Sequence, residues 1–106
     1  CCLSSLNIET WDQWHDHPQF IEDCMRFLDN VLQDYIDRSE PAMHRAAYAA
    51  MRERSVGLGV MGLHSFFQAR GLPFESAMAK SWNKKIFKHI RAQVDQASMT
   101  LAAERG

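Results

Sequence analysis

The sequence of 106 residues lacks several features that would place it in a functional class at once. It contains no run of about 18 apolar residues, so we expect no transmembrane helix and no membrane partner. Its net charge is −1, with 12 basic and 13 acidic residues interspersed, so charge does not indicate nucleic-acid binding. Its three cysteines are an odd number, which argues against a disulfide framework and favours a reducing, cytoplasmic compartment.

Patterns of self-contained active sites are also missing. The chain has no Cys-x-x-Cys pair, no recognisable Ser/His/Asp order and no pair of acids in an apolar setting. His15 and His17 lie two positions apart without the flanking cysteines of a zinc site, which favours solvated loop histidines. We interpret His64 as a packed or surface residue and Cys24 as a small core residue on the apolar face of a helix. We therefore expect no metal or cofactor site in this chain.

What the chain does contain is the composition of an ordinary globular domain, 46% apolar and 24% charged. Residues 1–106 are expected to form one unit, since no linker is long enough to divide them. A domain of this size buries about 65% of its unfolded surface. Because the chain opens on Cys1 in an apolar segment and not on Met, we expect a piece of a longer protein.

Hydrophobic periodicity predicts four helices, over about 18–38, 41–54, 63–70 and 75–104. In the first helix, one apolar stripe is expected at Phe20, Cys24, Phe27, Leu28, Val31 and Tyr35, widened by Ile21, Met25, Leu32 and Ile36. The last helix has the clearest stripe, at Trp82, Ile86, Ile90, Val94, Ala97 and Leu101. Before the first helix, Trp11 and Trp14 are expected to share one face of a single turn and to pack against that helix.

Residues 1–8 form the only strand that the sequence predicts. No second strand pattern is recognised, so this strand is expected to pair with neighbours outside the chain. The expected fold class is therefore mainly α: a short N-terminal strand or extended segment followed by about four helices.

Residues 52–62 (RERSVGLGVMG) are the least ordinary stretch, because Gly57, Gly59 and Gly62 interrupt helical sequence at about 1 kcal/mol each. Their spacing matches a dinucleotide fingerprint. However, a predicted helix precedes them, no second strand follows, and no Lys-Ser or Lys-Thr pair is present. We interpret the stretch as a buried break between helices, with backbone angles or close contacts at the glycines that alanine would not tolerate.

Three separated blocks resemble the large (catalytic) subunits of ribonucleotide reductases. Residues 1–7 (CCLSSLN) are similar to that family's Cys-x-Leu-Ser/Gly-Ser-Ile/Leu-Asn segment. Residues 52–62 resemble its Arg-x-Arg-(Ser/Thr)-(Ile/Val/Leu)-Gly-(Leu/Ile)-Gly-Val block, and residues 101–106 (LAAERG) its Leu-Ala-x-Glu-(Arg/Gln)-Gly. The resemblance covers the whole chain, but only a minor part of a large subunit. It implies a fragment from the C-terminal half of the family's ten-stranded α/β barrel, with the glycines at a buried turn where the helices meet the barrel.

The resemblance also implies a chemistry. In this family a thiyl radical on a loop cysteine removes the 3′ hydrogen of the substrate ribose. A pair of cysteines on neighbouring barrel strands then supplies the electrons that replace the 2′-hydroxyl with hydrogen, and becomes a disulfide. The motif maps Cys1 to that pair, with Cys2 as the alternative. The partner cysteine, the radical cysteine and the tyrosines of the radical relay lie outside this chain, so the chain alone is expected to be inactive.

The partners that the resemblance implies are the remaining segments of the large subunit, a radical-generating small subunit and, in the intact enzyme, a ribonucleotide. A dimetal small subunit is favoured over adenosylcobalamin, because the match is nearer to diphosphate reductases. The isolated piece is expected to self-associate through exposed apolar surface. Composition alone leaves a non-catalytic helical interaction module as the alternative, and a metal or nucleotide site on His15, His17 or the glycines is the least favoured hypothesis.

Overall fold

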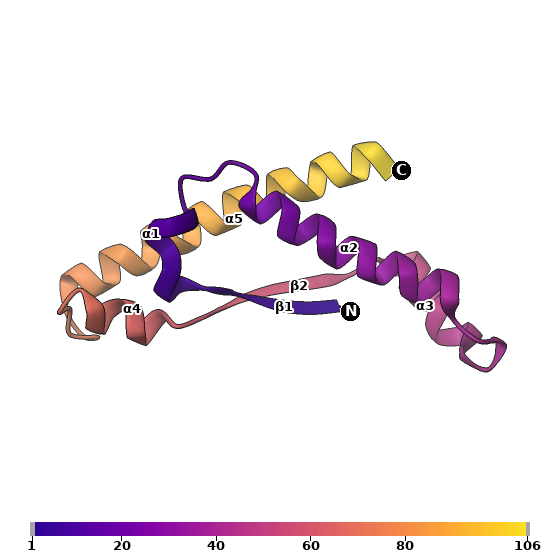
Figure 1. Cartoon of the computed structure of the whole chain (residues 1–106), viewed down its shortest axis with the longest axis horizontal. Helices are drawn as coiled ribbons and strands as arrows, with labels where there is room; N and C mark the ends of the chain where they lie inside the picture. The colour runs from indigo at the N-terminus through magenta and orange to yellow at the C-terminus, as the bar shows by residue number, and fades with distance from the viewer. Residues whose placement is uncertain (1, 106) are drawn as a thin grey trace.

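The computed structural model describes residues 2–105, which form a two-stranded parallel sheet and helices packed along it (Figure 1). The elements in chain order are β1 (Cys2–Asn7), η1 (Ile8–Thr10), α1 (Trp11–Trp14), α2 (Phe20–Arg38), η2 (Pro41–Met43), α3 (His44–Glu53), β2 (Val56–Met61), α4 (Leu63–Ala69) and α5 (Ala77–Arg105). The molecule is elongated, 53 × 27 × 19 Å, because α5 alone has 29 residues. The expectation of a mainly helical fold with an N-terminal strand is confirmed.

The second strand corrects the expectation that β1 has no partner within the chain. β1 and β2 pair in parallel, with Cys2 opposite Val56 and Asn7 opposite Met61. Helices α2 and α3 form the connection, as a parallel pair requires. The glycine block is therefore mostly strand and not a buried break between helices. The physical reason is that Val56, Leu58 and Val60 all point toward the core, at the two-residue spacing of a strand. The glycines between them made this spacing hard to recognise in the sequence.

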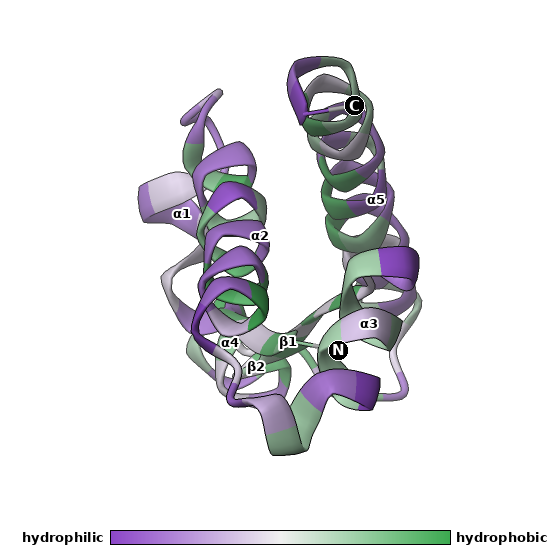
Figure 2. Cartoon of the chain, turned by 90° about the vertical axis from the view of Figure 1, so that its right-hand side faces the viewer, coloured by the Kyte–Doolittle hydropathy of each residue, from purple (hydrophilic) through white to green (hydrophobic). Residues whose placement is uncertain are grey.

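The core lies between the sheet and the two long helices. Leu6 is buried there, with Val56, Leu58 and Val60 packed beside it. Figure 2 shows that α2 and α5 stand above the sheet with their hydrophobic sides toward each other. The predicted stripe of α5 is confirmed, since its members are buried or packed against the core: Trp82, Ile86, Ile90, Val94, Ala97 and Leu101.

The predicted stripe of α2 is wrong in part. The hydrophobic side chains that this helix buries are those of Ile21, Met25, Leu28 and Leu32. Phe27, Val31 and Tyr35, expected in the main stripe, are 62%, 41% and 37% exposed. The ten apolar positions occupy a wider part of the helix surface than one neighbouring element can bury. Periodicity alone does not show which of these positions a neighbour buries. The outer side of α2 is consequently an exposed apolar surface.

The turn before α2 forms as expected. Trp11 and Trp14 meet edge to face with ring centroids 5.0 Å apart, and Trp14 stacks on Phe20 of α2 at 4.9 Å. The indole Nε1 of Trp14 donates a hydrogen bond of 3.1 Å to the backbone oxygen of Asn7. The two tryptophans therefore connect the end of β1 to the start of α2.

Candidate functional site

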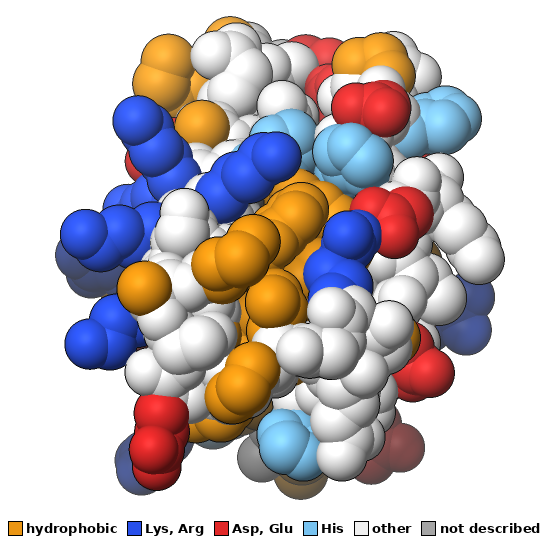
Figure 3. All heavy atoms as spheres, turned by 90° about the vertical axis from the view of Figure 1, so that its left-hand side faces the viewer, with side chains coloured by type: hydrophobic (Ala, Val, Ile, Leu, Met, Phe, Trp, Pro, Cys, Tyr) orange, Lys and Arg blue, Asp and Glu red, His pale blue; other side chains and the backbone are white. Residues whose placement is uncertain are grey.

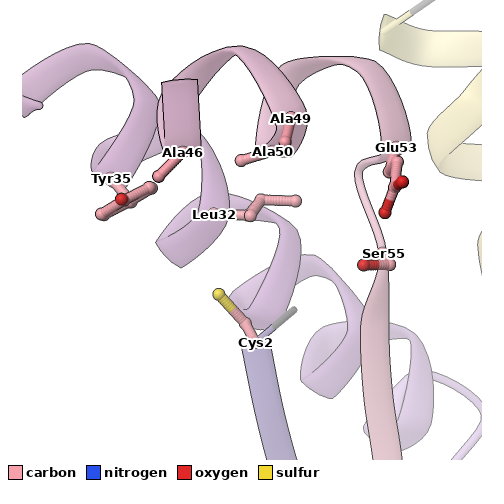
Figure 4. A pocket seen from close by; sticks show the side chains of 8 residues that line it. All are labelled: Cys2, Leu32, Tyr35, Ala46, Ala49, Ala50, Glu53 and Ser55. Atoms are coloured by element: carbon pink, nitrogen blue, oxygen red, sulfur yellow. The ribbon is translucent and has the colours of Figure 1, made fainter. Parts of the chain in front are cut away.

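The predicted site lies at the N-terminal end of the chain. Cys1, the expected redox residue, lies outside the described residues. Cys2, the alternative, begins β1, and its side chain points toward the helices into a pocket of about 410 Å³ (Figure 4). The pocket is lined by Cys2, Leu32, Tyr35, Ala46, Ala49, Ala50, Glu53 and Ser55. Cys2 therefore lies on the helix-covered side of the strand pair.

The other side of the strand pair is open among residues 2–105. Leu3 is 76% exposed there, and Ser5 is exposed as well. Their partners in β2 are Gly57 and Gly59, which contribute no side chain. This open face is a strip of nearly bare backbone from which Leu3 projects.

The three glycines do not share one role. Gly62 has φ +77°, and a Cβ built on it would lie 2.5 Å from Oδ1 of Asn7. That oxygen already accepts a hydrogen bond of 3.1 Å from the backbone N–H of Glu9. Gly59 lies in the strand, where a Cβ would meet Oγ of Ser5 at 3.8 Å, an ordinary contact. The expected intolerance of alanine is confirmed for Gly62 and is wrong for Gly59 within the described residues.

Sequence reasoning missed a polar cluster that joins three elements. The buried carboxylate of Asp29 in α2 accepts hydrogen bonds from Arg54, at 2.9 Å, and from Arg105 at the end of α5. Arg54 also donates to Gln33 at 2.7 Å, and Arg105 to Asn30 at 2.7 Å. Arg54 ends α3 with φ 46°, two residues before β2. The cluster therefore fixes the start of β2 against α2 and α5, and its only sequence signal was an acid on a largely apolar side of α2.

Three groups have shifted pKa values. The hydrogen bond from Arg26 holds the pKa of Glu104 below its usual value, and the same bond, 2.7 Å long, raises the pKa of Arg26. Burial raises the pKa of the Cys24 thiol, and the charge of Asp23 acts in the same direction. Cys24 packs against the core, as expected of a small apolar residue.

The histidines are spread along the chain, from the loop after α1 to α5. His15 stacks on Trp11, and its Nδ1 lies 2.9 Å from the backbone oxygen of that residue. His17 and His64 are exposed. Among residues 2–105, no three His, Cys, Asp or Glu side chains gather as a metal site would need. No helix in this part of the chain has the length and apolar character to span a membrane.

A parallel strand pair whose connecting helices cover one face is a building unit of α/β proteins, in which such units repeat around one sheet or barrel. Here the other face is open, so the geometry is that of a segment of a larger α/β domain. The family profile described as "Ribonucleotide reductase, barrel domain" matches residues 1–106. The chain belongs to this family.

Relatives agree with this assignment. The chain is 44% identical over 106 residues to the ribonucleoside-diphosphate reductase large subunit of Invertebrate iridescent virus 6, covering 100% of the chain and 11% of the relative. It is 42% identical over 106 residues to that of Invertebrate iridescent virus 3, covering 100% and 17%. The solved Actinobacillus ureae class Id ribonucleotide reductase alpha subunit superposes with a TM-score of 0.92 at 39% identity, covering 100% and 21%. The chain thus spans a minor part of these proteins, as the three motif blocks predicted.

Proposed function

We propose that the chain forms part of the catalytic barrel of a cytoplasmic ribonucleoside-diphosphate reductase, which converts ribonucleotides to deoxyribonucleotides. The observation that supports this proposal is the family match over residues 1–106 together with 44% identity to a large subunit of that name. In this role β1 and β2 are adjacent barrel strands, and α2 and α5 cover them from outside. The remaining segments of the large subunit complete the barrel.

Within that barrel, Cys1 is proposed as one of two thiols that are oxidised to a disulfide. The two thiols give up two electrons and two protons. The substrate takes them up as hydrogen replaces its 2′-hydroxyl and the oxygen leaves as water. A cysteine with this task must face the barrel interior, away from the covering helices. Cys2 faces the helices and the pocket between them, which supports Cys1 as the redox residue of the motif.

The radical that starts the reaction is proposed to come from a separate dimetal small subunit. The relatives of highest identity quoted above bear the name "large subunit", which itself implies a second, smaller chain. The partner cysteine and the radical cysteine come from other parts of the large subunit. The 106-residue chain on its own is consequently expected to form no deoxyribonucleotide.

The test compares Cys1→Ser with Cys2→Ser in a complete large subunit that carries this segment, supplied with its radical-generating partner and a dithiol reductant. We expect Cys1→Ser to abolish deoxyribonucleotide formation and Cys2→Ser to retain it, because only the former removes a thiol of the pair. Loss of activity in Cys2→Ser alone would transfer the role to Cys2. Full activity in both variants would disprove a redox role for this motif.

A further inference from the structure

The four lysines of the chain are not dispersed. Lys80, Lys84, Lys85 and Lys88 all lie in the N-terminal half of α5, and all four are exposed. No acidic residue occurs between Glu75 and Asp95. The near-neutral net charge of the chain therefore conceals a local excess of positive charge. Figure 3 shows basic side chains gathered on one side of the molecule, beside exposed hydrophobic ones.

These lysines differ from most of the arginines in having no acidic neighbour. Within residues 2–105, no ion pair joins any of the four lysines to a carboxylate. Arginines that do pair with acids are Arg26, Arg38, Arg54, Arg70, Arg91 and Arg105. Lys85 instead lies over the ring of Trp82, with Nζ 4.7 Å from the centroid. Lys80, Lys84 and Lys88 thus remain as a row of uncompensated charges on one side of α5.

This row is unfavourable for the helix that carries it. Lys80, Lys84 and Lys88 are four residues apart, a spacing at which like charges repel. Lys80 also lies in the first turn of α5, where the helix dipole disfavours cations. In α2, by contrast, a cation has an acidic neighbour at this spacing, since Arg26 pairs with Glu22 one turn away. Repelling positive charges that no carboxylate of the described residues neutralises are expected where a partner molecule supplies the negative charge.

We propose that Lys80, Lys84 and Lys88 form a docking surface for an acidic peptide segment of a separate partner protein. Four residues of helix rise about 6 Å. Alternate residues of an extended segment are about 6.6 Å apart, so acids at every second position can each meet one lysine. The surface goes beyond the proposed reduction chemistry and does not depend on the role of Cys1.

The surroundings of the row favour a protein partner over a nucleic acid. Phe87, next to Lys88 in α5, is 40% exposed and offers a contact to apolar side chains of a peptide. Residues 9–40 carry nine acids against two arginines, so an extended polyanion reaching beyond α5 would be repelled by this part of the chain. A short acidic segment confined to α5 avoids that repulsion.

The test titrates a peptide of about 12 residues, with glutamate at alternate positions and two leucines, into the 106-residue chain at low ionic strength. Amide shift changes are expected over residues 77–91. The variant Lys84→Gln/Lys88→Gln is expected to bind about fivefold to tenfold more weakly. The matched control Arg45→Gln/Arg52→Gln removes two cations of α3 and is expected to bind like the unmodified chain. Fluorescence anisotropy with a complete large subunit carrying the same variants decides the result if the short chain does not fold alone.

Other outcomes would overturn the proposal. These are no binding of the acidic peptide, equal binding of a peptide with glutamine in place of glutamate, and equal affinity of the lysine double variant. Tighter binding of a thymidine oligonucleotide, or of vesicles containing phosphatidylserine, would assign the surface to a different partner class. Without any peptide, Lys84→Gln is expected to raise the unfolding temperature, because it removes two repulsive pairs; a lower temperature would contradict the argument.

Discussion

Asp29 of α2 and Arg54 at the end of α3 are joined by a hydrogen-bonded ion pair of 2.9 Å across 25 residues of chain. Arg54 is the left-handed residue at which the chain turns from α3 toward β2. Helix α3 has no buried side chain of its own. The junction is therefore fixed largely by this charge pair and by the second arginine, Arg105, that shares the carboxylate.

Replacing Asp29 by asparagine is expected to lower the free energy of unfolding by about 2–3 kcal/mol, since two half-buried guanidinium groups lose their counter-charge. The measurement is urea unfolding followed by circular dichroism. Asp34→Asn is the matched control in the same helix, because Asp34 pairs with Arg38 at an exposed site. Its cost is expected to stay below about 0.5 kcal/mol. Equal costs in the two variants would refute the importance of the cluster.

The two glycines 59 and 62 are expected to respond to alanine with opposite signs. Gly62→Ala should destabilise the chain by about 2–3 kcal/mol, from the left-handed backbone and the displaced cap of Asn7. Gly59→Ala should be neutral or stabilising by up to about 1 kcal/mol, because its backbone is extended and space exists for the methyl group. Thermal unfolding of both variants under one condition gives the comparison. A large loss in Gly59→Ala would contradict it.

The pair of Arg26 and Glu104 makes stability depend on pH. The folded-state pKa of Glu104 is lowered, so the stabilisation is present above the ordinary value of about 4.5 and is lost as pH falls through the folded-state value. Carboxyl shifts followed by NMR should show Glu104 titrating below its ordinary range. In Arg26→Gln it should titrate closer to that range. An identical titration in both proteins would show that the ion pair does not form in solution.

The isolated chain is expected to self-associate through the outer side of α2. Phe27 and Val31 are exposed there, and large apolar patches drive association. Light scattering should show an apparent mass that rises with concentration. Phe27→Glu/Val31→Glu should reduce this rise, and Gln68→Glu/Gln96→Glu, which adds the same charge at exposed polar sites, should not. A monomer at high concentration would count against the prediction.

The sequence predicted the elements better than it predicted their surroundings. The stripe of α5 is a single face, so its period identified both the helix and its buried side. Helix α2 has apolar residues on two sides, and only tertiary contacts decide that Leu32 is buried and Val31 is not. The strand β2 could not be recognised as easily, because Gly57 and Gly59 have low strand propensity, although Leu58 and Val60 keep the period of a strand.

The candidate site was accessible to sequence reasoning only through the motif of residues 1–7. Period and composition did not select Cys1, and the resemblance did. The structure adds that Cys2 begins β1 and that its side chain points into the pocket lined by α2 and α3. The cluster around Asp29 could not be predicted, since its members are up to 76 residues apart and no local pattern links them.

The parallel register has a consequence for the order of folding. Every residue of β1 pairs with one 54 positions later, as Cys2 does with Val56, so all six pairs close a loop of the same length. Helices of local contacts such as α2 form quickly, whereas pairing across so long a loop is slow. During synthesis on the ribosome, β1 cannot pair with β2 until β2 has emerged. During that interval its backbone N–H and C=O groups are available to other chains, which makes this interval the period of greatest risk for misassembly.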